Sequence, residues 1–331
     1  MKYYKQEKFA PLQGSSQLFK HKTVAIIGVG GLGSHSAEYM VRMGMGTVIL
    51  VDDDVIEVSN LPRQGIYTQF DSDENLLKAE VAAEQLQKVN PDVTVIAKVI
   101  RLRDNNIDEI LRNVDLVLDG TDNLKTRYLL NDYCFQNNIP WIYGSATSSM
   151  GTVTSFIPGQ TPCFRCVYGN HESEDNASCD VNGVILPALT VTASLQVTEA
   201  IKILAGTKNV LVEEIRYNVW TREESSVDIR IFEDKECLCK KDTHNKTNAE
   251  KHNQAIYILC SGDSVQVNHT YSEKEVTSLF LNSGYLLNTR NPVFKEFKKR
   301  NGKRAVAFNT GKIVFHHTGK DEVERLLKKE N

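Results

Sequence analysis

Short apolar runs alternate with stretches of helical spacing along about the first 150 residues. Apolar positions recur with a helical period after Gly33, over Lys78–Val89 and over Leu124–Gln136. Strands that alternate with helices are typical of a parallel sheet covered by helices, so we predict an α/β fold for this part of the chain. The apolar runs, each bounded by turn residues, are Val24–Ile27, Val48–Val51, Val93–Val99, Asp115–Leu118 and Trp141–Tyr143.

After Gly151 the pattern changes to extended segments, interrupted by one long helical stretch from about Pro187 to Leu204. We therefore predict that the parallel half of the sheet continues into a mixed or antiparallel half. The extended segments are Thr152–Ile157, Ile215–Val219 and Val227–Ile231.

Composition indicates a boundary further along. Between Cys239 and Ala255 the only apolar residue is Ala249, which is typical of a linker. Beyond it, short strand-like pieces precede a charged terminal helix, at Ile256–Leu259, Val265–Val267, Ala305–Phe308 and Ile313–Phe315. We predict a first domain over residues 1–236, a polar linker over 237–254 and a small α+β module over 255–331.

Charge and hydropathy exclude some classes of partner. The 39 Lys and Arg residues nearly balance 42 Asp and Glu residues, so the net charge of −3 gives no general reason to expect nucleic-acid or membrane-surface binding. No run approaches the ~18 apolar residues of a membrane span, and residues 1–5 lack the apolar stretch of a secretory signal. We expect a soluble cytoplasmic protein. In that reducing compartment, seven cysteines with two close pairs favour metal or thiol chemistry over disulfides.

A glycine-rich segment follows the first apolar run directly. Val24–Ile27 leads into Gly28-Val29-Gly30-Gly31-Leu32-Gly33 and then into a helical pattern. Glycines let the backbone approach phosphates, and the N-terminus of the helix supplies N–H donors, so Gly28, Gly30, Gly31 and Gly33 predict a nucleotide site in a Rossmann-like fold over about residues 20–150. The alternative is a tight turn without a ligand. A P-loop is excluded because no Lys-Ser/Thr follows the glycines.

An acidic side chain about 20 residues beyond such a loop holds a ribose hydroxyl in many nucleotide-binding proteins. The second apolar run ends in Asp52-Asp53-Asp54, and we choose Asp52 for this role. Asp54 can contribute to the site or cap the following turn.

Three further segments favour transfer of a nucleotide over transfer of a hydride. They are Ser59–Gln64, Leu77–Glu80 and Leu118–Asn123. Attack on an α-phosphate needs positive groups around the phosphates, and Arg63 and Lys78 can supply them. Asp122 follows a parallel strand, where ligands bind in such sheets, and can hold Mg²⁺.

The joint occurrence of GxGGLG, D-x-D-x(4)-SNLxRQ, a helix-opening lysine and TDN resembles the ThiF/MoeB/HesA family over about residues 1–232. The resemblance implies an ATP site with Asp52 at the ribose and Mg²⁺ at Asp122. It also implies that Asn60, Arg63, Gln64 and Lys78 surround the phosphates, with Asp54 and Asn123 beside them. Read without the resemblance, Asn60 is a turn residue and the cations are surface charges.

Family members also begin with an Arg-Tyr-x-Arg-Gln-like segment, whose second arginine reaches the phosphates of the partner subunit in a homodimer. This chain has Lys2-Tyr3-Tyr4-Lys5-Gln6 instead. Lys5 keeps the charge of that arginine but loses its planar, bidentate fork. The resemblance therefore implies a homodimer with an altered contact between the subunits.

Two cysteine pairs, Cys163/Cys166 and Cys237/Cys239, have spacings that can share one tetrahedral zinc. Relatives carry two CxxC pairs on a structural zinc, whereas the second pair here is C-x-C. We expect a four-thiolate zinc, with ordinary buried thiols as the alternative and His244 as a possible substitute ligand.

The cysteine at position 179 lies in a polar segment, Asn176–Gly183, where an exposed thiol is expected. Cys179 resembles the cysteine of the family's crossover loop, which in thiamin-pathway members can form a covalent link with the activated carrier. A free loop cysteine without chemistry is the alternative. Cys134 and Cys260 are interpreted as structural, and the C-terminal module lacks the cysteine loop of a rhodanese.

Overall, the resemblance implies ATP-dependent adenylation of the C-terminal Gly-Gly carboxylate of a ubiquitin-fold sulfur carrier of the MoaD or ThiS kind. It also implies a sulfurtransferase or cysteine desulfurase as a further partner. The glycine loop alone favours an NAD-dependent oxidoreductase, but that alternative does not explain why SNLPRQ, Lys78 and TDN occur together. A second alternative is a non-catalytic partner-binding subunit that lacks the nucleotide residues, whereas this chain keeps them; ATP binding by the isolated protein would reject it.

Overall fold

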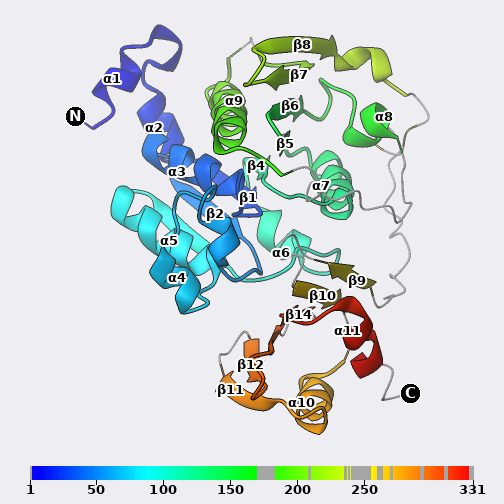
Figure 1. The fold of residues 1–331 in the computed structure, drawn as a ribbon. Coiled ribbons are helices and arrows are strands. Elements are labelled where there is room, and N and C mark those ends of the chain that lie inside the picture. Colours follow the sequence, from blue (N-terminus) through cyan, green and yellow to red (C-terminus); the bar gives the residue numbers. More distant parts are fainter. Residues whose placement is uncertain are drawn as a thin grey trace. The chain divides into compact units, whose positions relative to one another are not determined.

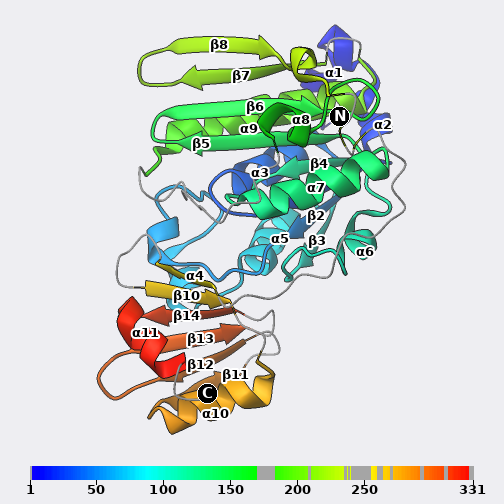
Figure 2. The same cartoon turned by 90° about the vertical axis from the view of Figure 1, so that its right-hand side faces the viewer.

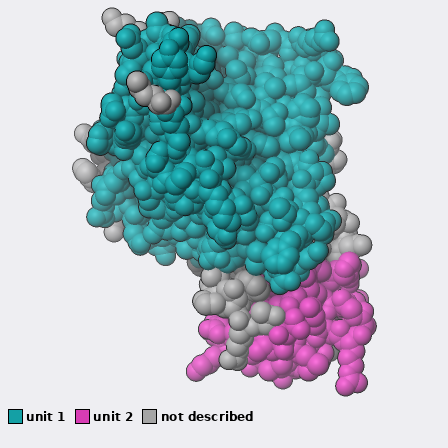
Figure 3. All heavy atoms as spheres, turned by 90° about the vertical axis from the view of Figure 1, so that its left-hand side faces the viewer, with its two compact units in different colours: residues 1–244 teal, residues 245–331 magenta. Residues whose placement is uncertain are grey.

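The computed structural model describes residues 2–169, 183–207, 210–234, 237, 239, 255–258, 264–268, 271–290, 294–308 and 312–327. The chain divides into two compact units, Met1–His244 and Asn245–Asn331, which are distinguished by colour in Figure 3. Each unit contains its own sheet. Most of the predicted linker over 237–254 lies outside the described residues, so the predicted domain bounds stay a prediction.

Unit 1 is built on an eight-stranded sheet in the order β3-β2-β1-β4-β5-β6-β7-β8 (Figures 1 and 2). Its five strands from β3 to β5 are parallel, and β5 to β8 are antiparallel. The predicted α/β fold, with a parallel half that continues into an antiparallel half, is confirmed. The strands are β1 (Thr23–Ile27), β2 (Thr47–Val51), β3 (Thr94–Lys98), β4 (Leu116–Asp119), β5 (Trp141–Thr147), β6 (Met150–Phe156), β7 (Glu213–Asn218) and β8 (Glu223–Asp228).

Helices cover both faces of this sheet and form two separate cores. One core joins the sheet to α3 (Gly33–Met43), α5 (Lys78–Val89) and α9 (Leu186–Leu204). The other joins it to α6 (Ile107–Leu111), α7 (Leu124–Gln136) and α8 (Phe164–Tyr168). Because β1 is covered on both faces, its residues after Thr23 are apolar and buried without alternation. The shorter helical segments of this unit are α1 (Tyr4–Glu7), η1 (Ala10–Leu12), α2 (Ser15–Phe19), η2 (Val58–Asn60), α4 (Gln69–Asp73) and η4 (Ile229–Phe232).

The predicted strand at 227–231 is wrong in its second half. Strand β8 ends at Asp228, and η4 begins at Ile229. The side chain of Asp228 accepts a hydrogen bond from the backbone N–H of Arg230, at 2.9 Å. This local cap competes with strand pairing and ends the strand, although the apolar residues that follow suggest continuation.

Unit 2 holds a six-stranded antiparallel sheet in the order β11-β12-β13-β14-β10-β9, with one core shared with two helices. The predicted α+β class is confirmed, and the predicted pieces correspond to four of the strands. Helix α10 and strands β11 and β12 were not predicted. The elements are β9 (Ala255–Ile258), β10 (Ser264–Asn268), α10 (Glu273–Asn282), β11 (Leu286–Arg290), β12 (Phe294–Lys298), β13 (Arg304–Phe308), β14 (Lys312–His316) and α11 (Lys320–Leu327).

None of the helices in the described part of the chain combines the length and apolarity that crossing a membrane requires.

Candidate nucleotide site

The ends of β1 and β4 meet where the strand order of the sheet changes direction. Such a switch point is where open α/β sheets bind ligands. The backbones approach so closely there that a Cβ atom on Gly28, whose φ is +83°, would lie 2.8 Å from the carbonyl oxygen of Gly120. A Cβ atom on Gly33 would clash with the carbonyl oxygen of Gly28. A Cβ atom on Gly120 would clash with the same oxygen, so packing requires glycine at all three positions.

Gly30 has a different reason to be glycine. The nearest atom to a Cβ placed there is the Nε2 atom of Gln64, at 3.7 Å, so protein packing would tolerate a side chain. Helix α3 begins three residues later, and no side chain caps its N-terminus. Within the first turn, the backbone N–H of Ser34 donates to the carbonyl of Gly30, at 3.1 Å. The N-terminal end of the helix carries positive potential that attracts anions, so the open side of Gly30 suits a phosphate.

Asp52 ties the glycine loop to the end of β2. Its carboxylate accepts hydrogen bonds from the backbone N–H groups of Val29, at 2.7 Å, and Asp54, at 2.8 Å. Burial raises the pKa of Asp52 to about 6, with Lys78 opposing and Asp54 adding to the shift. The carboxylate is thus mainly ionised at pH 7 and already positions the loop. Its contact with a ribose stays a prediction.

Lys78 begins α5 and lies beside the same strand end. Its Nζ atom forms an ion pair with Asp54, at 3.0 Å, and its side chain is 9% exposed. Burial by itself would lower the pKa of Lys78, but Asp54 and Asp52 outweigh burial and raise it. The lysine is therefore charged at all physiological pH values, as a phosphate-binding group must be.

The segment from η2 to Gln64 carries three more of the predicted residues. Asn60 accepts a hydrogen bond from the backbone N–H of Glu57 at 3.1 Å, so its side chain closes a turn. Arg63 is half-buried and donates to the carbonyl of Ser59 at 2.6 Å. Gln64 is only 3% exposed, yet its Oε1 atom has no hydrogen-bond partner among the described residues. An amide oxygen only accepts hydrogen bonds, so this orphan fits a donor on a ligand, such as a ribose hydroxyl, and does not bind a phosphate oxygen.

Asp122 and Asn123 follow β4 at the same edge. Both are exposed, and Asn123 caps α7 by accepting a hydrogen bond from the backbone N–H of Thr126 at 2.9 Å. The carboxylate of Asp122 projects from the turn between strand and helix, where one carboxylate together with substrate phosphates can hold Mg²⁺.

Lys5 lies elsewhere. It is exposed on α1, whose Gln6 approaches the carbonyl of Met43 at 3.5 Å, at the C-terminal end of α3. Because α3 has 11 residues, this end lies about 16 Å from the glycine loop of the same subunit. Lys5 is therefore remote from the site of its own chain.

The sequence did not predict a buried network that supports the turn carrying Asp122. Asp119 is fully buried and forms an ion pair with Arg127, at 3.1 Å. Arg127 also donates to the carbonyl of Thr121 at 2.7 Å. The side chain of Gln196 on α9 donates to the carbonyls of Asp119 and Ile142, at 2.8 and 2.9 Å. The sequence feature that could have predicted this network is an arginine on a buried helix face, eight residues after an aspartate at a strand end.

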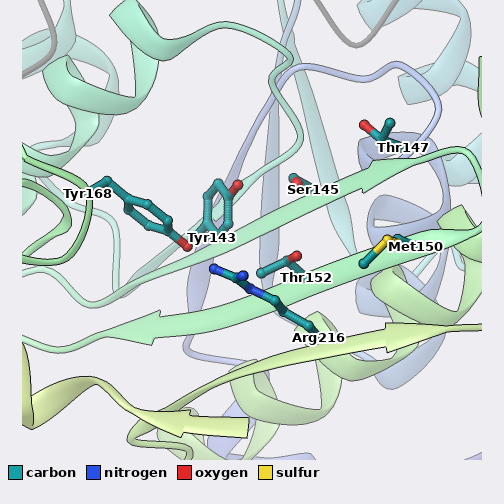
Figure 4. Close-up of a pocket in the computed structure, with 7 residues that line it drawn as sticks. All are labelled: Tyr143, Ser145, Thr147, Met150, Thr152, Tyr168 and Arg216. Atoms are coloured by element: carbon teal, nitrogen blue, oxygen red, sulfur yellow. The ribbon is translucent and has the colours of Figure 1, made fainter. Parts of the chain in front are cut away.

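A pocket of about 250 Å³, with several polar side chains in its wall, lies on the β5–β7 face of the sheet (Figure 4). The guanidinium of Arg127 lies over the ring of Tyr143, 4.8 Å from its centroid, and so connects the pocket wall with the turn after β4. On the other side Glu214 binds both the Tyr168 hydroxyl and Arg216, the latter at 2.6 Å. The residues that line the pocket are Tyr143, Ser145, Thr147, Met150, Thr152, Tyr168 and Arg216.

The four paired cysteines converge on one point. The sulfur of Cys163 lies 3.7 Å from that of Cys166 and 3.5 Å from that of Cys237, and Cys166 lies 3.9 Å from Cys239. Four thiolates around zinc at about 2.3 Å have sulfur–sulfur distances of about 3.8 Å, so the geometry fits a tetrahedral site even with the C-x-C pair. Cys134, which was interpreted as structural, is buried. Cys179, Cys260 and His244 lie outside the described residues.

A family model described as the ThiF family matches residues 3–241. The chain belongs to the ThiF family. Within that family, it is 33% identical over 322 residues to the sulfur carrier protein ThiS adenylyltransferase of Bacillus subtilis (strain 168), with 96% of this chain and 95% of the relative covered.

Two further similarities are consistent with this membership. The chain is 38% identical over 213 residues to a probable molybdopterin-synthase adenylyltransferase of Porphyra purpurea, covering 63% of this chain and 55% of the relative. Its fold resembles a crystal structure of Escherichia coli MccB with ATP, with a TM-score of 0.56, 23% identity and coverage of 65% and 66% of the two chains. At this identity the second similarity concerns the fold alone.

Proposed function

We propose that this ThiF-family chain uses ATP to adenylate the C-terminal carboxylate of a ubiquitin-fold sulfur carrier protein. It is a nucleotidyltransferase, as the adenylyltransferases among its relatives are. The carrier is of the ThiS or MoaD kind, because the Bacillus subtilis relative is named for ThiS and the Porphyra purpurea relative for molybdopterin synthase. With 95% of the Bacillus subtilis relative covered, a ThiS-type carrier is the first to test.

One observation carries the proposal. At a single edge of the sheet, the glycine loop and the N-terminus of α3 lie beside a buried, charged lysine. A hydride-transferring enzyme has no need for a buried lysine at this point, whereas the phosphates of ATP need positive charge there. The site therefore favours nucleotidyl transfer over the NAD-dependent alternative.

The reaction requires no proton transfer. An oxygen of the carrier's carboxylate attacks the α-phosphorus of ATP, and the bond from that phosphorus to the oxygen bridging to the β-phosphate breaks. The products are carrier-CO-AMP and pyrophosphate. A C-terminal carboxylate has a pKa of about 3.3–3.7, so it is ionised at pH 7 without a general base. Catalysis then consists of alignment and neutralisation of charge by Arg63 and Lys78.

Mg²⁺ fits this site as a partner of the phosphates. We assign Asp122 as its protein carboxylate, because a magnesium ion in such sites uses one or two carboxylates and completes its shell with phosphate oxygens and water. When bound, the ion neutralises charge on the leaving pyrophosphate. Lys5 is assigned to the phosphates of the partner subunit in a homodimer, which is consistent with its distance from the site of its own chain.

We assign the pocket on the β5–β7 face to the carrier's tail. Tyr143 in its wall contacts Arg127, which in turn fixes the turn after β4. An extended Gly-Gly tail that crosses this polar face would bring its carboxylate towards the phosphates. Cys179 stays the predicted site of a covalent link with the activated carrier, and a sulfurtransferase or cysteine desulfurase stays the predicted source of sulfur.

We assign zinc to the four thiolates of Cys163, Cys166, Cys237 and Cys239. Their four sulfur atoms all lie within 4.8 Å of one another, which supports the assignment. The metal would join α8 to the segment after η4, which are 71–76 residues apart in sequence, and its role is structural because all four positions are filled by protein.

Pyrophosphate exchange with purified carriers tests the proposal. We expect exchange of labelled pyrophosphate into ATP with either a ThiS-type or a MoaD-type carrier. The matched control is the same carrier without its last two glycines, which should give no exchange above background. Exchange that is equal with both forms of the carrier, or none with either carrier type, would contradict the proposed substrate. If the absorbance of a nicotinamide cofactor changes when the protein is titrated with substrates, the oxidoreductase is supported instead.

A further inference from the structure

Tyr67 is a buried tyrosine that contacts two separate elements of the nucleotide site. Only 6% of its surface is exposed. Its hydroxyl donates a hydrogen bond to the carbonyl of Val29, in the glycine loop, at 2.8 Å. The same hydroxyl lies 3.3 Å from the carbonyl of Lys78, at the start of α5. One phenolic oxygen thus lies between two elements that are 49 positions apart along the chain.

The groups around this hydroxyl are themselves held in place. The peptide N–H of Val29 is bound by Asp52, and its carbonyl by Tyr67, so both ends of this residue in the glycine loop are fixed. Lys78 is held at its backbone N–H by the carbonyl of Asp54 and at its Nζ atom by the carboxylate of the same residue. The hydroxyl of Tyr67 completes a closed set of contacts between β2, the glycine loop and α5.

We propose that Tyr67 is a positioning residue for ATP, whose hydroxyl fixes the separation between the glycine loop and Lys78. The inference rests on the proposed function and adds a residue to it. Tyr67 acts through Val29 and Lys78 and needs no contact with ATP. With the two elements fixed in advance, the phosphates meet donors that need no rearrangement on binding.

The hydroxyl is a donor throughout the range of any assay. Burial raises the pKa of Tyr67 well above its ordinary value, and the charges of Asp52, Asp54 and Asp71 add to this effect. The role of Tyr67 is therefore independent of pH between about 6 and 9.

The substitution Tyr67→Phe removes the hydroxyl and leaves the ring in the hydrophobic core to which it belongs. A typical hydrogen bond is equivalent to a change of about five- to tenfold in a binding constant. We expect the dissociation constant for ATP and Mg²⁺, measured by calorimetry without a carrier, to rise by this factor. In pyrophosphate exchange, the KM for ATP should rise similarly, while the KM for the carrier stays within about twofold.

Tyr133→Phe is the matched control. Tyr133 is also buried, and its hydroxyl donates to Asp108 at 3.0 Å on α6, on the other face of the sheet. This variant should lose a similar amount of thermal stability and keep the ATP affinity of the unaltered chain. An unchanged ATP affinity in Tyr67→Phe, or an equal loss of affinity in both variants, overturns the role of Tyr67. Failure of the unaltered chain to bind ATP is a different result, because it refutes the proposed function and the role of Tyr67 together.

Discussion

Removing the buried cation at Arg127 should destabilise unit 1 strongly. Arg127 is 6% exposed and its partner Asp119 is fully buried, so Arg127→Met leaves a carboxylate without its counter-charge in the core. Breaking a buried pair by removing one partner costs about 3–5 kcal/mol. Asp119 keeps hydrogen bonds from the N–H and hydroxyl of Thr121, at 2.8 and 2.6 Å, so we expect a loss near 3 kcal/mol.

The loss should depend on pH in a defined direction. Burial raises the pKa of Asp119 and Arg127 opposes that shift. In Arg127→Met the opposing charge is gone, so the folded-state pKa rises further above the value of about 3.9 in the unfolded chain. Between these two values the folded state binds the extra proton, and stability falls as the pH rises. The loss is therefore larger at pH 8 than at pH 5.

Urea unfolding followed by tryptophan fluorescence measures this effect in unit 1 alone, because both tryptophans of the chain, Trp141 and Trp220, belong to that unit. With a slope of about 2–3 kcal/mol per molar urea, a loss of 3 kcal/mol lowers the midpoint by about 1–1.5 M. Arg112→Met is the control, since its ion pair with Asp108 is exposed and should contribute less than about 1 kcal/mol.

A second variant tests the cause of the loss. Asp119→Asn added to Arg127→Met removes the unpaired charge and should recover at least half of the lost stability at pH 8. If the double variant is as unstable as Arg127→Met, and both lose the same stability at pH 5 and pH 8, then packing around the arginine stem explains the effect and the electrostatic reasoning is refuted.

Three other predictions concern the nucleotide loop, the phosphate groups and the metal. Asp122→Ala and Arg63→Ala should each reduce pyrophosphate exchange at least about 100-fold with an unchanged melting temperature, and normal exchange would exclude the assignment. Gly33→Ala should prevent stable folding because its Cβ atom would clash with the backbone, whereas Gly30→Ala should fold and lose ATP affinity. Circular dichroism measures the folding of both variants, and calorimetry measures their ATP affinity. Full ATP affinity in Gly30→Ala would contradict the phosphate contact. Metal analysis should find one zinc per chain, and Cys163→Ser should lower that content and the melting temperature.

The helices and strands that the sequence predicted well are those whose spacing of apolar residues is visible within the segment itself. Helices over Lys78–Val89 and Leu124–Gln136 have the predicted bounds, because each segment has a buried face with helical period. The second helix is also capped by the side chain of Asn123. Helix α10 had a readable signal too: Ser272 and Glu275 form a capping box at its start. The end of β8 was predicted wrongly because it depends on one aspartate side chain. Periodicity does not show whether that side chain points to solvent or accepts a hydrogen bond from the backbone.

The candidate site also contains residues that the sequence predicted and residues that it did not. Its glycines, Asp52 and Asp122 follow strand ends in the sequence, and the topology of a parallel sheet brings strand ends together without further information. Lys78 begins a helix and was predicted from the motif. The residues that hold those groups in place could not be found in this way. Gln196 is a polar residue on an apolar helix, and its amide binds carbonyls 77 and 54 positions away in sequence.

Periodicity predicts that Gln196 faces the sheet, but it cannot predict which buried carbonyls will be opposite. Tyr67 presents the same difficulty, because burial of an aromatic ring is expected for packing alone and its hydroxyl has no local partner that would reveal a second role. A buried polar group must have its hydrogen bonds satisfied, so each such residue predicts that a partner exists. The identity of the partner depends on the tertiary structure. Motifs therefore indicate the chemistry of this site, and the buried polar residues outside the motifs determine how rigidly the site is held.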